Sequence, residues 1–239
     1  MFHVKHSELT ARVIGQHGLK ATAEQLELLD RYLQMVLEWN AKINLISRRD
    51  EENIVGQHLL HSLAPLFVLS MPAELTVMDL GSGGGFPGIP LAILNPGWKV
   101  VLVDSIRKKT LALEDMVARL ELGSVHVVTG RVEEKDVLAL MRGKFDVIFA
   151  RGVASLTKLA VWSRPFARRS AGNFLSVRRA EGGESGQHLL PLLLCYKGGD
   201  LAAELKEAKI KAGVKHAAVL DLTFPGGEGM EKKLVLVNL

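Results

Sequence analysis

Three glycines, Gly81, Gly83 and Gly85, follow the acidic residue Asp79 at the end of an apolar run. Glycines let the backbone turn tightly and approach a ligand, and the helix expected behind them directs free N–H groups into the turn. A dinucleotide-binding turn requires glycine three residues after Gly83, where this chain has Phe86. A carboxylate at Asp79 suits the ammonium group of a methionine moiety and repels a pyrophosphate. The pattern therefore favours S-adenosylmethionine over a dinucleotide and over a purely structural turn.

Two later segments carry residues that suit the rest of this cofactor. The apolar run 99–104 ends in Asp104, whose carboxylate can accept both ribose hydroxyls of an adenosine or cap the following helix; we favour the ribose. After the run 125–129, Val132 can flank an adenine ring and Glu133 can bond its edge. An acidic residue here also stabilises a helix start, and both roles remain open.

Arg151 follows the next apolar run, where methyltransferases usually place the residues specific to their reaction. An arginine stays protonated in proteins, so it cannot act as a general base, but it can hold a carboxylate, a phosphate or a base edge. The Asn/Asp-Pro-Pro-Tyr motif used on exocyclic amines is absent after this run. The residues predict a transfer that needs no protein base.

Strands and helices alternate from residue 75 onward, which predicts a parallel sheet wound right-handed with its ligand at the carboxyl edge. The expected strands are 75–80, 99–104, 125–129 and 145–150, and the expected helices between them are 89–94, 108–122 and 132–141. The fifth strand is either 173–177 or 189–196. We prefer 189–196 because a helix over 200–212 follows it, ended by Gly213. The chain closes with a hairpin of strands 217–224 and 233–238.

The preferred fifth strand leaves residues 168–188 as a long loop, which contains Arg168, Arg169, Arg178 and Arg179. Loops of this length are often functional or disordered. We expect these arginines, together with Lys108 and Lys109, to contact a polyanion.

Residues 7–70 precede the sheet and show helical spacing, which predicts a helical subdomain over 1–70 and a cofactor-binding domain over 71–239. Thr22 with Gln25 forms a capping-box pattern. Asn40 and Asn44 flank a turn, which they either shape against the next domain or cap as a helix end. His58 and His61 are three residues apart without a third ligand nearby, so we expect helix-face histidines and no metal site.

Composition indicates a soluble α/β protein with a polyanionic partner. Of 239 residues 48% are hydrophobic and 23% charged, and the net charge is +4 with a pI near 9.2. The single cysteine, Cys195, excludes an internal disulfide and a cysteine-built zinc site. No apolar run is long enough to cross a membrane, and the first residues lack the apolar core of a signal peptide, so we expect a cytoplasmic protein.

Taken together, these segments resemble the RsmG (GidB) family of bacterial small-subunit ribosomal RNA methyltransferases over nearly the whole chain. The resemblance rests on Trp39-Asn40-x-x-x-Asn44-Leu45, on the 79–90 segment with its unusual Gly-Phe-Pro-Gly-Ile-Pro run, on Val103-Asp104-Ser105 with Lys108-Lys109, on Arg131-Val132-Glu133-Glu134 and on Arg151-x-x-Ala154-Ser155-Leu156. It implies a Rossmann-like class I methyltransferase sheet with helices on both faces and an N-terminal helical extension. It also implies methyl transfer from S-adenosylmethionine to N7 of one guanine in 16S ribosomal RNA.

For the cofactor site the resemblance implies Gly81, Phe86, Asp104, Val132, Glu133 and Arg151. We add Asp79, Gly83 and Gly85 to the cofactor site, and Arg151 and Lys197 as catalytic residues. The expected partner is 16S RNA or the small subunit, bound by a monomer; a different RNA or a small molecule is the alternative substrate. Two departures stand out: His61 precedes Ser62 where the family has an acid, and Arg178 rivals Lys197 for the family's lysine after the fifth strand.

Overall fold

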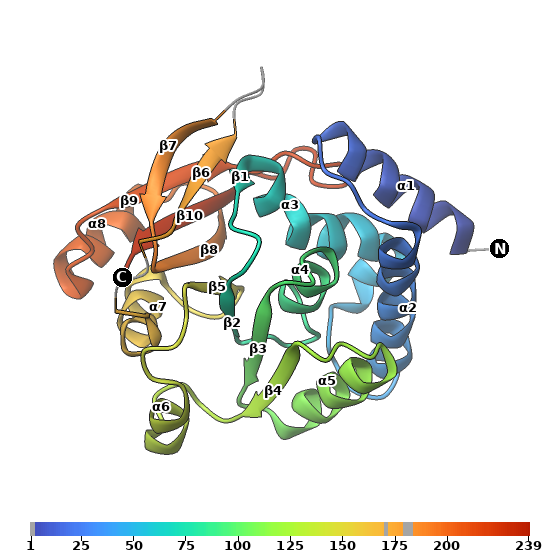
Figure 1. Ribbon diagram of the computed structural model, residues 1–239, viewed down its shortest axis with the longest axis horizontal. Helices are drawn as coiled ribbons and strands as arrows, with labels where there is room; N and C mark the ends of the chain where they lie inside the picture. Colours follow the sequence, from blue (N-terminus) through green and yellow to red (C-terminus); the bar gives the residue numbers. More distant parts are fainter. Residues whose placement is uncertain (1–2, 170–171, 179–183) are drawn as a thin grey trace.

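The computed structural model describes residues 3–169, 172–178 and 184–239 (Figure 1). A seven-stranded sheet with the order β4-β3-β2-β5-β8-β10-β9 forms its centre. Strands β4, β3, β2, β5 and β8 are parallel, and β10 runs antiparallel between β8 and β9. The strands are β2 (Thr76–Leu80), β3 (Lys99–Asp104), β4 (Val125–Thr129), β5 (Val147–Arg151), β8 (Leu192–Gly198), β9 (Ala217–Asp221) and β10 (Lys232–Asn238). The predicted parallel sheet with a terminal hairpin is confirmed.

Helices cover both faces of this sheet. Successive strand residues point to opposite sides, so the apolar side chains on each face need helices to bury them. On one face, Val77 of β2 packs in a core shared with the N-terminal helices, α4 and α5. On the other, the next residue, Met78, packs with α6, α7 and α8. The helices are α1 (His3–Gln16), α2 (Ala23–Asn40), α3 (His61–Val68), α4 (Gly88–Leu94), α5 (Arg107–Arg119), α6 (Lys135–Met141), α7 (Leu156–Ser163) and α8 (Ala202–Ala212).

The N-terminal helices pack against the main sheet and α4. The predicted capping box of Thr22 and Gln25 is present, and the Gln25 amide also donates to the carbonyl of Ile93 at 2.9 Å. One continuous core joins Val13 of α1 to Leu236 of β10. The division of the chain at residue 70 stays a prediction.

The segment between α2 and α3 departs from the regular helical spacing expected over residues 7–70. It forms a 3-10 helix, Arg48–Asn53, then a π-helix, Val55–Leu60, and then α3. A π-helical stretch is rare and widens the turn, which changes the direction of the side chains that follow.

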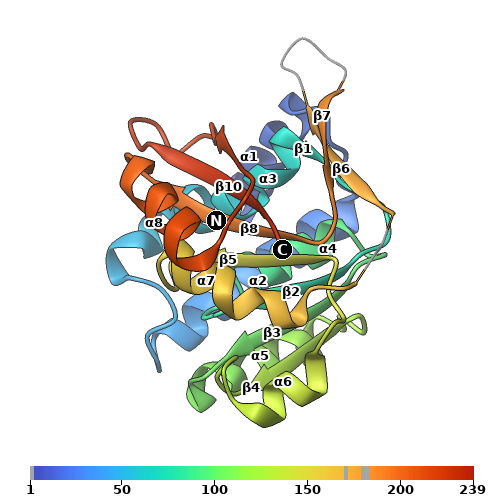
Figure 2. The ribbon, with the colours of Figure 1, turned by 90° about the vertical axis from the view of Figure 1, so that its left-hand side faces the viewer.

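The prediction of a long loop over 168–188 is wrong. Two strands, β6 (Phe174–Arg178) and β7 (Glu184–Leu189), pair antiparallel, and β6 also pairs with the short strand β1 (Leu69–Ser70). Figure 2 shows this hairpin beside the main sheet. Pairing satisfies backbone groups that a loop would leave to water, and it buries Leu175 fully. Both candidate fifth strands therefore exist, with 173–177 in the small sheet and β8 in the main one.

No helix in the described parts of the chain is long and apolar enough to cross a membrane. The thiol of Cys195 is buried inside β8, and burial raises its pKa to about 12. Among the described residues, no group of three or more histidine, cysteine or acidic side chains is placed to hold a metal ion.

Candidate active site

A cavity of about 390 Å³ lies at the carboxyl ends of β2, β3, β4 and β5. The turns after these four strands line it, and they bring together residues far apart in the sequence. Predicted cofactor residues among its walls are Gly81, Gly83, Asp104, Val132 and Glu133. Asp79, Gly85, Phe86 and Arg151 do not line this cavity.

Asp104 ends β3 with its carboxylate in the wall of the cavity, 8% exposed. One oxygen accepts from the backbone N–H of Gly83 at 2.9 Å and the other from that of Ile106 at 2.8 Å. A carboxylate has about four acceptor positions, so both oxygens retain capacity for a further donor. Local turn bonding and ribose binding are therefore compatible, and the turn bonds fix the carboxylate in place.

Gly81 requires glycine for two reasons. Its φ is +76°, and a Cβ there would lie 2.5 Å from a methyl carbon of Val153 in the turn after β5. Its own N–H donates to the Val103 carbonyl at 2.8 Å, which ties the turn to β3. The absence of a side chain leaves the floor of the cavity open.

Asp79 is fully buried beneath the glycine turn at the end of β2. Its Oδ2 accepts from the N–H of Gly88 at 2.9 Å, whereas Oδ1 has no partner among the described residues. Burial raises the pKa of this carboxyl group to about 7, against the opposing effects of the Gly88 N–H and the Arg151 charge. A buried acceptor without a donor fits the ammonium group of S-adenosylmethionine, reached directly or through water.

Arg151, the last residue of β5, points toward the N-terminal helices. Its guanidinium carbon lies 5.2 Å from the centre of the Phe86 ring, and Nη2 donates to Nδ1 of His58 at 3.0 Å. The Phe86 ring, 3% exposed, also packs edge-on against Tyr32 at 5.1 Å. Phe86, predicted to contact the cofactor, is thus a buried platform beneath Arg151.

His58 forms hydrogen bonds with both Arg151 and Asp50, so Asp50 fixes the orientation of the ring that holds Arg151. Because a guanidinium only donates, Nδ1 of His58 must accept, and its proton sits on Nε2, which faces Oδ2 of Asp50 at 3.0 Å. Burial and the adjacent Arg151 charge lower the His58 pKa to about 4. A neutral His58 thus holds Arg151 at physiological pH.

His61 is also buried and neutral. It stacks on Phe224 at 5.1 Å and meets Tyr196 edge-on at 5.2 Å. Burial, followed by the charge of Arg151, lowers its pKa to about 3. The acid that the family has at this position would be enclosed by two aromatic rings here, so the histidine is a packing residue.

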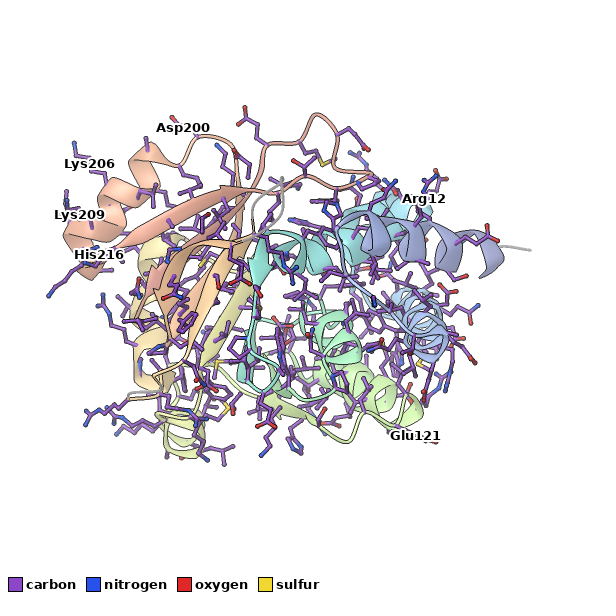
Figure 3. All side chains as sticks on the ribbon, turned by 45° about the horizontal axis from the view of Figure 1, so that its top comes forward. Arg12, Glu121, Asp200, Lys206, Lys209 and His216 are labelled. Carbon is purple, nitrogen blue, oxygen red and sulfur yellow. The ribbon has the colours of Figure 1, made fainter. Side chains whose placement is uncertain are left out.

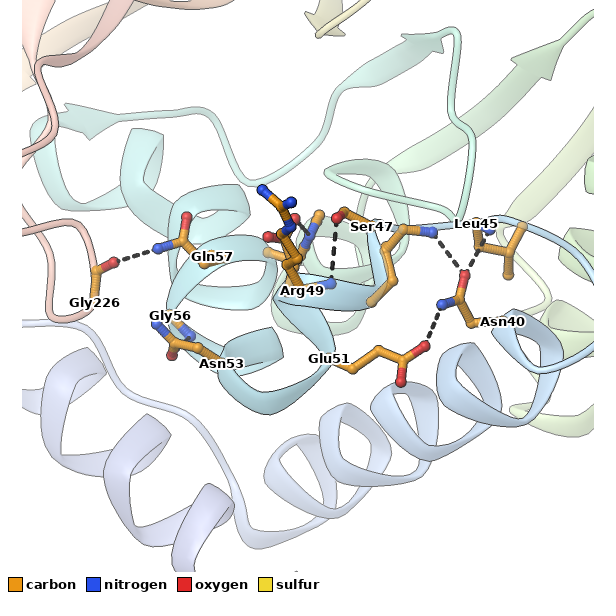
Figure 4. A network of polar contacts seen from close by, with 12 residues as sticks. Asn40, Leu45, Ser47, Arg49, Glu51, Asn53, Gly56, Gln57 and Gly226 are labelled. Carbon is orange, nitrogen blue, oxygen red and sulfur yellow. Dashed lines mark hydrogen bonds and ion pairs between the residues drawn. The ribbon is translucent and has the colours of Figure 1, made fainter.

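The turn within Trp39–Leu45 packs against the glycine turn, which is the first of the two alternatives that the sequence left open. Figure 4 shows the Asn40 amide oxygen accepting from the N–H groups of Leu45 and Ile46, at 2.8 and 2.9 Å. Its nitrogen donates to Glu51. This holds Leu45 where a Cβ added to Gly84 would lie only 3.4 Å from the Leu45 Cβ. Asn40 therefore braces the glycine turn from outside.

Lys197 follows β8 as predicted, but its ammonium group is engaged in structure. It donates to the Ala154 carbonyl at 2.9 Å and to Glu204 at 2.7 Å. Glu204 also accepts from the N–H of Leu156 at the start of α7. The lysine thus fixes the turn after β5, whose Val153 lines the cavity. This arrangement favours positioning of that turn over direct catalysis.

The predicted RNA-binding residues do not form one patch. Lys109 lines the cofactor cavity, and Lys108 is exposed beside it on α5. Arg178 lies on the hairpin, where Nε donates to the Leu69 carbonyl at 3.0 Å. Arg168 and Arg169 line a separate cavity. Arg179 lies outside the described residues.

The residues of the cavity wall that sequence reasoning did not assign to the site include Ile106, Val153 and Trp162. Ile106 is 48% exposed and lines the same cavity as Val132. An apolar residue soon after a strand-ending acid is a usable signal for an adenine contact. Trp162 comes from the end of α7, and no local pattern marks it.

Comparison with solved structures supports the fold. A SAM-dependent methyltransferase from Aquifex aeolicus aligns with a TM-score of 0.53 and 14% identity over 80% of this chain and 96% of that chain. The TYW2 protein of M. jannaschii, solved in complex with AdoMet, aligns with a TM-score of 0.51 and 14% identity over 82% and 78%. At such identity the likeness shows a class I methyltransferase fold.

Sequence comparison shows the family. A Chlorobaculum tepidum protein named ribosomal RNA small subunit methyltransferase G is 37% identical over 194 residues, 81% of this chain and 77% of that one. Its Staphylococcus saprophyticus namesake is 33% identical over 228 residues, 94% and 86% of the two chains. A model of the family described as GidB, rRNA small subunit methyltransferase G, matches residues 25–185. The chain therefore belongs to the rRNA small subunit methyltransferase G family of S-adenosylmethionine-dependent enzymes.

Proposed function

We propose that this protein transfers the methyl group of S-adenosylmethionine to N7 of a guanine in 16S ribosomal RNA. The observation that carries the proposal is the cavity at the carboxyl edge of the sheet, in a chain of this family. The glycine turn bounds the cavity at one end, Asp104 presents a fixed carboxylate in its wall, and Val132 with Ile106 offers apolar surface for a base.

The cofactor, when bound, supplies a methyl group that its sulfonium makes electrophilic. Guanine N7 carries an in-plane lone pair that is free of its proton, so the chain need supply no base. Its residues then act by positioning, which can itself contribute several kcal/mol, on the order of 7–11 for ideal alignment. Asp104 would hold the ribose, and Asp79 would bind the ammonium group beneath the turn.

Arg151 would hold an anionic group beside the reacting atoms. Its guanidinium is fixed by His58 and by the Phe86 ring. Because N7 gains positive charge during transfer, a cation facing N7 would oppose the reaction. We therefore assign Arg151 to the carboxylate of the cofactor or to an RNA phosphate.

The RNA must present its guanine edge in an unpaired or opened segment, because the deep major groove of an RNA helix shields N7. Lys108 and Lys109 stand next to the cavity and would meet the phosphates around the target. We place the reaction in the cytoplasm, where this RNA or the assembled small subunit is found, and assign it to a monomer.

Methyl transfer from radiolabelled S-adenosylmethionine to a 16S RNA transcript and to purified small subunits tests the proposal. Label should enter RNA, and borohydride reduction followed by aniline should cleave the chain at the modified base, as N7-methylguanine requires. The variant Arg151→Ala should lose methyl transfer. Its affinity for the cofactor should fall by no more than the loss of a single contact accounts for. The exposed-site variant Arg12→Gln is the matched control. Label without cleavage would mean another acceptor atom, and no label in either RNA would favour the small-molecule alternative.

A further inference from the structure

A second large cavity, about 710 Å³, lies at the other end of the sheet from the cofactor cavity. It is lined by Pro191, just before β8, and by residues on either side of β5 in the chain. Four arginines are among its walls: Arg142, Arg164, Arg168 and Arg169. They come from the end of α6, from the turn after α7 and from the segment that follows it.

Two of these arginines are tied into the protein. Arg168 pairs with Asp146 at 2.9 Å and donates to the Thr76 hydroxyl at 3.1 Å. Arg164 donates to the carbonyl of Ala212, at the end of α8. Their remaining guanidinium N–H groups border the cavity with fixed directions.

The other two arginines, Arg142 and Arg169, are exposed, and within the described ranges no hydrogen bond or ion pair occupies their guanidinium groups. Among the described residues, Asp146 is the one acidic side chain that forms an ion pair with any of these four arginines. The four guanidinium charges therefore exceed the negative charge that is paired with them. Such a concentration repels itself unless an anion binds, and guanidinium groups match phosphate oxygens in geometry.

The two cavities open at opposite edges of the sheet. Strand β5 runs between them, from Val147 near the arginines to Arg151 near the cofactor cavity. Its length alone separates them by roughly 13 Å. One nucleotide cannot occupy both, whereas a folded RNA that wraps around the edge of the sheet can.

We propose that the cavity of Arg142, Arg164, Arg168 and Arg169 binds backbone phosphates of the substrate RNA, in a segment distant from the target base. This proposal rests on the proposed function, because it takes the RNA as substrate. Contacts to phosphate fix orientation without reading sequence, so this surface would align the RNA while the carboxyl edge selects the guanine.

The test uses the full chain with Arg142→Gln and Arg169→Gln combined, because the guanidinium groups of these two arginines have no partner among the described residues. Arg12→Gln with Lys20→Gln removes the same charge from exposed positions at the N-terminal helices and is the matched control. Figure 3 shows Arg12 on α1, away from α8 and its labelled residues Lys206 and Lys209. Each protein is titrated with a 16S RNA transcript at several salt concentrations.

Two lost phosphate contacts should reduce the slope of log K against log salt by about 1.4 to 1.8, and raise the Kd roughly 25- to 60-fold near 0.1 M salt. Methyl transfer should show a raised RNA KM and an unchanged rate at saturating RNA, with cofactor affinity intact. The control variant should shift Kd less than about threefold, since its charges lie outside any phosphate contact.

The proposal would be overturned if the arginine-cavity variant had the same Kd and salt slope as the control variant, whether both kept wild-type RNA affinity or both lost it equally. Each protein is also titrated with inorganic pyrophosphate. If the arginine-cavity variant loses pyrophosphate binding but keeps its RNA affinity, the cavity binds a small anion and the proposal is overturned. Failure of the proposed function appears in the wild-type chain instead: either no label enters RNA, or label enters without cleavage at the modified base, whatever the Kd values of the variants.

Discussion

Cofactor affinity should depend on pH through Asp79. This carboxyl group is fully buried, with a pKa raised to about 7 and one oxygen without a partner. The ammonium group of the cofactor requires the ionised form, so only the ionised fraction of the free protein is competent to bind. That fraction is ~3% at about pH 5.5 and ~50% at about pH 7.0. The Kd of the wild-type protein should therefore fall ~16-fold over this interval, equivalent to ~1.6 kcal/mol.

The substitution Asp79→Asn keeps the shape of the side chain and removes its titration. Its Kd should be the same at both pH values, and weaker than that of the wild type at about pH 7.0. Isothermal titration calorimetry with S-adenosylmethionine measures both, in a range where an α-amino group of ordinary pKa stays protonated. His58 and His61 do not titrate there, because their pKa values are lowered to about 4 and about 3.

Asp104→Asn serves as the comparison variant and should weaken binding at every pH. Because the Asp104 charge helps to raise the Asp79 pKa, this variant should also bring the Kd values at the two pH values closer together. A wild-type Kd that is constant over the interval would refute the role of Asp79. A pH dependence that persists in Asp79→Asn would assign the titration to another group.

Three further predictions concern the same site. Asp104→Ala should weaken cofactor binding by ~1–3 kcal/mol, because it orphans ribose hydroxyls and two backbone donors; calorimetry on a folded variant that shows wild-type affinity would contradict it. The wild-type single-turnover rate, with cofactor and RNA saturating, should be nearly flat from about pH 6 to pH 9, since the transfer uses no base. A tenfold rise in rate over this range that disappears on substitution of one titratable residue would show that the protein supplies a general base. Lys197→Met should lower the melting temperature and raise the cofactor KM, because it releases Ala154 and Glu204, while the saturated rate stays within twofold; a large loss of that rate would restore Lys197 as a catalytic residue.

The parallel strands β2, β3, β5 and β8 were predictable from the sequence because both of their faces are largely buried. Such strands appear as short continuous apolar runs, and the helices between them follow a different period. The residues that end β2 and β3, Asp79 and Asp104, could be placed at one edge for the same reason. Parallel order with right-handed crossovers leaves little freedom in where consecutive strand ends lie.

The hairpin of β6 and β7 could not be found in the same way. Strand β7 reads Glu-Ser-Gly-Gln-His-Leu and is largely exposed, so no apolar alternation marks it. Its stability comes from pairing with β6, which pairs in turn with the two residues of β1. The π-helix over Val55–Leu60 was hidden for a related reason, because a six-residue stretch does not distinguish its period from that of an α-helix.

The roles of Arg151 and Phe86 were only partly predictable, because their partners are distant in the chain. The arginine stood out at the end of a strand, but its partner His58 lies 93 positions away. The expected cofactor contact of Phe86 came from the resemblance to the family, because its position in the turn argued only against a dinucleotide. Its burial against Tyr32 and beneath the guanidinium is a property of the assembled fold.

The N-terminal helices therefore hold residues of the candidate site in place. Tyr32 donates to the Gly84 carbonyl at 2.9 Å and so holds the glycine turn from one side. His58 holds Arg151 from the other side, and its own orientation depends on Asp50. The turns after β2, β3, β4 and β5 line most of the cofactor cavity, but the restraint on Arg151 comes from outside the sheet. Because Tyr32 and His58 both precede β2, the helical segment and the sheet together fix the geometry of the candidate site.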